Sequence, residues 1–66
     1  MKSGTINRDL TEKDTGGMDV AQGTPVWEFE GITYGCVSPH GIAVSFKSDG
    51  STPFQEVPRD SVDWSA

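Results

Sequence analysis

The chain has 66 residues, and its five basic and ten acidic residues give a net charge of −5. A chain of this length forms at most one small domain, which buries only about 60% of its unfolded surface. Binding to nucleic acid or to an anionic membrane requires clustered Lys and Arg, so the composition disfavours both. An acidic domain of this kind suits a basic protein partner, or uses its charge to stay in solution.

The chain has a single cysteine, Cys36, so an internal disulfide is excluded. There is also no Cys/His cluster to hold a structural zinc ion, and we expect no cofactor. The opening "MKSGTINRDL" lacks the apolar stretch of a secretory signal, and no apolar run approaches the roughly 18 residues of a membrane helix. These features predict a cytoplasmic protein, and its small core makes an oligomer or a bound partner an expectation.

Residues 1–22 are polar, and their few apolar residues outline no face. Ile6 and Leu10 lie four positions apart, which allows one amphipathic turn, but so short a helix is marginal in water. We therefore predict a flexible N-terminal arm over residues 1–22 that orders on a partner, and a small β-barrel domain over residues 23–66.

From residue 23 onward, apolar and polar residues alternate in three stretches, "PVWEFEG", "ITYGCV" and "GIAVSFK". Alternation with a period of two is typical of half-buried strands. Turn residues separate the stretches. The first turn is a tight one at Glu30–Gly31, the second is "SPHG", and the third is the hairpin tip "SDGS", which precedes "PFQEV". The side chains predicted to face inward are Phe29, Ile32, Tyr34, Cys36, Ile42, Val44 and Phe46, and Trp27 is left open between core and interface.

The end of the chain predicts two further strands around one short turn. "PFQEV" forms a fourth strand, which ends at Pro58 because proline has no N–H to donate to a ladder. "PRDS" suits a single 3₁₀ turn, and "VDW" forms a fifth strand with Val62 and Trp64 on the inner face. The predicted fold is therefore all-β, a small barrel of about five antiparallel strands.

This ending resembles that of small SH3-like, or Tudor-like, barrels, in which a 3₁₀ turn joins the last two strands. The motif is Val57, Pro58 and Val62, and the resemblance covers residues 24–64. Proline-binding SH3 domains carry a long acidic loop between their first two strands, whereas this chain is predicted to have only Glu30–Gly31 there. The resemblance therefore favours the short-looped barrels over a polyproline groove, and it does not fix a function.

Two groups of residues are candidates for binding a partner. Trp27 and Trp64 lie near strand ends, and tryptophan is a frequent anchor at protein interfaces, although a small core also needs large side chains. Two or three aromatic residues beside carboxylates such as Glu28 or Asp49 could also form a cage for a cation. The acidic candidates would form a negative patch if they shared a face, and are otherwise an ordinary solvated surface. They are Glu28, Glu30, Glu56 and Asp63.

Catalysis is not expected. Cys36 and His40 are four residues apart, but a nucleophilic pair needs an orienting group and an oxyanion site, and neither is identifiable. We expect Cys36 to be a small core residue and His40 to be a solvated turn residue.

The sequence predicts a non-enzymatic protein-binding module whose acidic and aromatic surface engages a basic protein partner. One alternative is an acidic inhibitor of the phage or prophage type that occupies a nucleic-acid-binding surface of a host protein. The other is a self-associating structural or assembly subunit.

Overall fold

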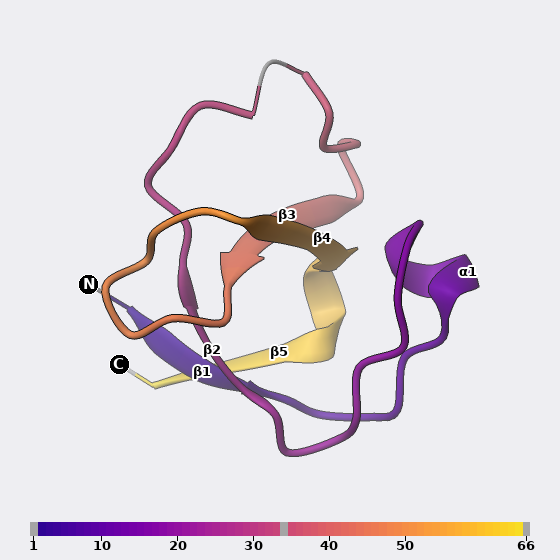
Figure 1. Cartoon of the computed structure of the whole chain (residues 1–66). Coiled ribbons are helices and arrows are strands. Elements are labelled where there is room, and N and C mark those ends of the chain that lie inside the picture. Colours follow the sequence, from indigo (N-terminus) through magenta and orange to yellow (C-terminus); the bar gives the residue numbers. More distant parts are fainter. Residues whose placement is uncertain (1, 34, 66) are drawn as a thin grey trace.

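The computed structural model describes residues 2–33 and 35–65, which form an all-β fold with very little helix. Five antiparallel strands make one sheet in the order β4-β3-β2-β1-β5 (Figure 1). The strands are β1 (Ser3–Ile6), β2 (Pro25–Glu28), β3 (Gly41–Ser45), β4 (Phe54–Pro58) and β5 (Val62–Ser65). A four-residue helix, α1 (Glu12–Thr15), lies between β1 and β2, and a 3₁₀ turn at Arg59–Ser61 joins β4 to β5. The predicted class, strand number and 3₁₀ turn are confirmed.

The flexible arm predicted for residues 1–22 does not match the structure. β1 lies inside the sheet and pairs with β2 on one side and β5 on the other. Beyond it, the backbone amides of Leu10 and Val20 donate to each other's carbonyls at 2.8 and 2.9 Å. Residues 2–22 are ordered by pairing with residues far away in the sequence, and the spacing of apolar residues within the segment does not predict that pairing.

The core is aliphatic. Among the described residues, seven hydrophobic side chains are buried, and three of them come from the predicted arm. The seven are Ile6, Leu10, Val20, Val26, Val44, Val57 and Val62. Ile42, Phe46 and Trp64 are partly buried and pack against this cluster, as the sequence predicts for all three.

The strand predicted for "ITYGCV" and the tight turn predicted at Glu30–Gly31 are both absent from the described residues. β2 ends at Glu28 and the next strand begins at Gly41, so residues 29–40 form a long connection. The physical reason is that β2 already has β1 on one edge and β3 on the other. An alternating segment next to β2 therefore has no edge on which to form a ladder. Tyr34, predicted to face inward, lies outside the described residues.

The later turns agree with the sequence. The Gly41 amide donates to the Ser38 carbonyl at 3.1 Å, which closes the "SPHG" turn. The Gly50 amide donates to the Lys47 carbonyl at 2.9 Å in the hairpin between β3 and β4.

The first two strands are thus β1 and β2, and residues 7–24 join them. The prediction that only Glu30–Gly31 stands in this place is wrong, because it rests on a strand assignment that omits β1. The connection is long, and it carries four acidic residues, Asp9, Glu12, Asp14 and Asp19, against two basic ones, Arg8 and Lys13.

Candidate functional site

Trp27 and Trp64 lie on opposite faces of the sheet. Trp27 pairs with Ser3 across the β1–β2 ladder, and Trp64 pairs with Gly4 across the β1–β5 ladder. Cross-strand partners point to the same face, whereas consecutive residues of β1 point to opposite faces. The structure therefore does not bring the two tryptophans together in one surface.

Trp64 belongs to the inner face. It pairs with Gly4, which also pairs with the fully buried Val26, and its ring packs against the core cluster. A Cβ atom added at Gly4 would lie 2.7 Å from the Asp63 carbonyl oxygen and 3.1 Å from the Trp64 ring, so glycine permits this close approach. The Lys2 ammonium lies 5.9 Å from the Trp64 ring centroid, within range of a cation–π contact. Trp64 is in the first place a packing residue.

Trp27, Phe29 and Phe54 lie on the outer face, opposite the core, and we refer to them as the outer aromatic cluster. Trp27 pairs with Ser45, which in turn pairs with Phe54, so these positions share a face. The Phe29 and Phe54 rings stack with centroids 4.6 Å apart and an interplanar angle of 30°. All three side chains are half-buried, and the cluster is only partly covered by the protein.

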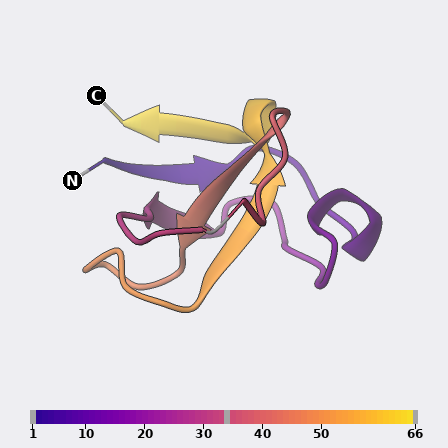
Figure 2. The same ribbon diagram turned by 90° about the horizontal axis from the view of Figure 1, so that it is seen from above.

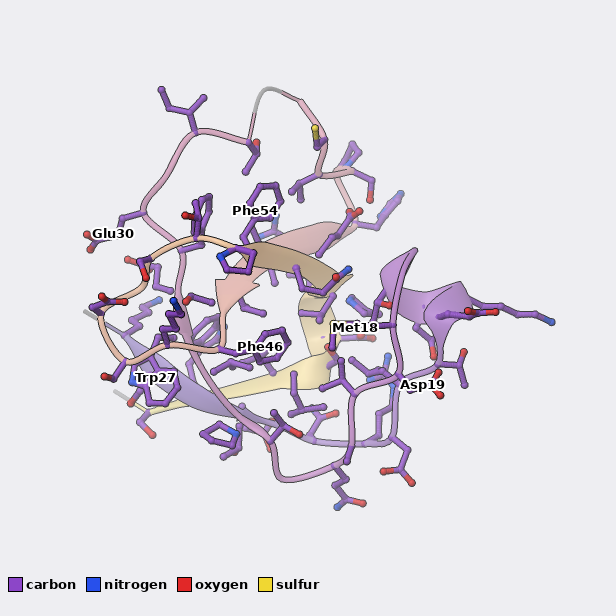
Figure 3. The ribbon with its side chains drawn as sticks, viewed as in Figure 1. Met18, Asp19, Trp27, Glu30, Phe46 and Phe54 are labelled. Atoms are coloured by element: carbon purple, nitrogen blue, oxygen red, sulfur yellow. The ribbon has the colours of Figure 1, made fainter. Side chains whose placement is uncertain are left out.

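The prediction that Phe29 packs in the core is wrong, and Trp27, for which core and interface were both open, lies on the outer face. Val26 is the β2 residue that enters the core, and a strand shifted by one residue turns every side chain to the other face. "PVW" places apolar residues at consecutive positions, so alternation alone leaves two choices of face. Phe46, in contrast to Phe29, does pack against the core cluster as predicted. In Figure 3 it lies near the middle of the molecule, with Trp27 and Glu30 toward one side and Met18 and Asp19 toward the other.

Phe54 is one of six aromatic residues between residues 24 and 64, and the predicted strand "PFQEV" assigns it no face. One signal in the sequence bears on it: if the apolar Val57 enters the core, as it does in the structure, alternation turns Gln55 the same way and Phe54 and Glu56 outward. Gln55 agrees with this assignment, because its side-chain amide reaches back across the fold to donate to the Thr15 carbonyl at 2.7 Å.

The four acidic candidates are dispersed. Glu28 is half-buried at the end of β2 opposite Val44, and Glu30 is exposed in the connection that follows. The Glu56 carboxylate accepts a 2.6 Å bond from the Ser38 amide, and the Asp63 carboxylate accepts a 3.2 Å bond from the Asn7 side-chain amide. Two of the four thus hold connections of the fold in place. Glu28 and Glu30 both adjoin Phe29 in the sequence, but Glu28 shares a face with the buried Val44, whereas Glu30 is exposed.

A hollow of about 290 Å³ lies between α1, the turn before β3 and the end of β4. His40 and Pro58 line it and also line a second hollow, which extends toward Arg59 and Asp60. The described residues that line the two hollows include Pro39 and Pro58 but no Phe, Tyr or Trp. Proline-rich segments dock in aromatic-lined grooves, so this lining does not favour a polyproline ligand.

Cys36 does not enter the core. Its side chain is exposed in the 29–40 connection, which corrects the prediction of an inward-facing cysteine. The reason is again the missing strand, since without a ladder the alternation of "ITYGCV" defines no inner face. His40 is exposed, as predicted for a turn residue. The part of the chain that the structure describes holds no group of three His, Cys, Asp or Glu residues able to bind a metal ion.

Comparisons with protein-family models, with curated proteins and with solved structures found no match to this chain. Within the described ranges, no helix has the length and apolar character needed to span a bilayer.

Proposed function

We propose that this chain is a non-enzymatic protein-binding module that presents the outer aromatic cluster to a basic protein partner. The observation that carries the proposal is the division between an aliphatic core and an aromatic outer face. In the part of the chain that the structure describes, the buried hydrophobic residues are all Ile, Leu or Val, and Trp27, Phe29 and Phe54 are not among them. Large aromatic side chains left partly exposed are the residues that most often supply the binding energy of an interface.

Charge supports a basic partner. The chain carries a net charge of −5, and Glu30 is exposed next to Phe29 in the sequence. Opposite charges at the border of an interface mainly increase the rate of encounter and the selectivity for the partner, and salt weakens them. An acidic inhibitor of a nucleic-acid-binding protein is a special case of this proposal, in which the partner surface normally holds phosphate.

Two features of the fold also support the SH3-like resemblance as a proposal. A 3₁₀ turn follows Val57 and Pro58 and leads into Val62, and a long acidic connection joins the first two strands. The outer aromatic cluster is a different surface from the hollows beside His40, so the proposed binding mode does not depend on a polyproline groove.

The test compares the two tryptophans. The tagged protein captures its partner from lysate, and the affinity for the purified partner is then measured for Trp27→Ala, Phe54→Ala and Trp64→Ala. We expect Trp27→Ala and Phe54→Ala to weaken binding at least about tenfold, as interface anchors do, and to leave the thermal midpoint nearly unchanged. Trp64→Ala should lower the thermal midpoint. If both outer-face variants bind the partner as the wild type does, the proposal is wrong.

A second test of the proposal varies salt and surface charge. Glu30→Lys should slow association and reduce its dependence on salt, because it removes an exposed attraction. Glu12→Lys is the matched control, since Glu12 is also exposed but lies in α1. Equal effects of the two variants would show that only net charge matters and that the border of the aromatic cluster does not.

A further inference from the structure

The two edge strands of the sheet, β4 and β5, are protected to different degrees. At the β4 edge, the Gln55 side chain donates to the Thr15 carbonyl, and the strand ends at Pro58, which lacks an N–H. α1 also packs against β4. β5 has β1 on one side, and in Figure 2 it runs along the border of the molecule with no described segment on its other side.

The hydrogen-bond pattern shows which groups of β5 point outward. The Asn7 amide donates to the Ser61 carbonyl at 2.8 Å, which makes these two a hydrogen-bonded pair. Such pairs alternate along an antiparallel ladder, so Asp63 and Ser65 also bond to β1. Val62 and Trp64 occupy the other positions, and their N–H and C=O groups point away from β1. Outside the strand ladders, no described backbone hydrogen bond uses them.

The side chains of this edge select against a second copy. Asp63 is exposed on the outer face, between Val62 and Trp64 on the inner face. Antiparallel pairing of β5 with another β5 through both outward positions would place Val62 opposite Trp64 and Asp63 opposite itself. Like charges directly opposite each other in a ladder are destabilising, and a charge on an edge strand is a common protection against such pairing.

We infer that the β5 edge binds an extended segment of a partner protein by strand addition, with a basic residue between two apolar ones. The two apolar residues would exchange backbone hydrogen bonds with Val62 and Trp64 and cover the exposed part of the Trp64 ring. The Lys or Arg between them would lie opposite Asp63. In strand addition, main-chain bonds provide affinity and alternate side chains provide specificity. This surface is separate from the outer aromatic cluster and does not depend on the function proposed for it.

The test uses the full chain and a synthetic peptide, acetyl-Thr-Val-Lys-Val-Thr-amide, titrated by NMR. We expect the amide signals of Val62 and Trp64 to shift and their hydrogen exchange to slow. Methylation of both valine nitrogens should abolish binding, because it removes the two donors that face β5. Methylation of the backbone nitrogen of the lysine should preserve binding, because the N–H of that residue faces away from β5.

Charge reversal tests the side-chain part. Replacing the peptide lysine by glutamate should weaken binding by up to about fivefold, and Asp63→Lys should reverse that preference. Glu12→Lys, an equal charge change in α1, should leave the preference as in the wild type. Trp27→Ala should bind the peptide as the wild type does, because Trp27 is not part of the β5 edge. Loss of partner binding at the outer aromatic cluster and loss of strand addition at β5 are therefore measured separately.

Three outcomes would overturn the inference. The first is the absence of any shift at Val62 and Trp64 at millimolar peptide. The second is equal binding of the peptides methylated at valine and at lysine. The third is sedimentation of the wild-type protein as a dimer in which the Val62 and Trp64 amides are already protected from hydrogen exchange without peptide, which would show that a second copy occupies this edge.

Discussion

Two segments differ from their patterns in opposite directions: residues 2–24, predicted as a flexible arm, contain a strand, and the connection formed by residues 29–40, predicted to contain a strand, has none among its described residues. The first segment shows no alternation, yet it provides the strand between β2 and β5 and three of the buried aliphatic side chains. The second contains "ITYGCV", which alternates well, yet the structure assigns no strand to its described residues. Alternation shows that a segment could be half-buried in a sheet. Whether it forms a ladder with the strand before it depends on the edges of that strand, and β1 and β3 occupy both edges of β2.

The largest effect is expected when the first segment is deleted. Removal of residues 2–22 would take away β1 and the buried Ile6, Leu10 and Val20, and would separate β5 from the rest of the sheet. Small domains have only about 0.05–0.15 kcal/mol of stability per residue, so a loss of this size should unfold the remainder. Circular dichroism during heating should show no cooperative transition. A cooperative transition near the wild-type midpoint would mean that residues 23–66 fold alone.

Two isoleucines provide a matched comparison of the segments. Ile6 is 1% exposed and Ile32 is 72% exposed. Ile6→Ala should lower the free energy of unfolding by about 2–5 kcal/mol, because it leaves a cavity in the core. Ile32→Ala should change it by about 0.5 kcal/mol or less. Urea denaturation of both variants measures the difference, and equal losses would contradict the placement of the two segments.

The smallest expected effect concerns the start of α1, which lies within the first segment. The Thr11 amide donates to Asp14 Oδ2 at 2.8 Å, and this bond holds the pKa of the Asp14 carboxyl below its ordinary value of 3.8. A pKa lowered by folding gives stability that is present above the ordinary value and is lost as the pH falls through the lowered one. Asp14→Asn should therefore be less stable than the wild type near neutral pH.

At strongly acidic pH this difference should close, because the wild-type carboxyl is then protonated. Denaturation of both proteins across the acid range measures the gap, and an NMR titration of the Asp14 carboxyl carbon gives the midpoint directly. A midpoint at or above 3.8 would show that the bond from Thr11 does not hold in solution.

The later part of the fold could be predicted because its signals are local. Pro58 ends β4, the "SPHG" and "SDGS" turns have suitable residues at each position, and "GIAVSFK" alternates in one phase only. Val62 and Trp64 were placed on the inner face for the same reason. Each of these features depends on residues a few positions apart, which the sequence shows directly.

The candidate site was predicted less well. The structure separates the two tryptophan candidates and spreads the four carboxylate candidates over several elements. The face of Trp27 depends on whether Val26 or Trp27 enters the core, and that choice is made by the pairing with β1 and β3. The edge position of β5 likewise follows from the strand order, which no local pattern contains.

Local signals in the residue pattern are enough to indicate a small acidic all-β chain, with a hairpin followed by a 3₁₀ turn and a final strand. Tertiary pairing decided that residues 3–6 lie between β2 and β5, which face of β2 is buried, and that residues 29–33 and 35–40 lie outside the sheet. The physical reason is that turn and alternation signals arise from neighbouring residues. Strand pairing instead depends on which edges are still open when distant segments meet.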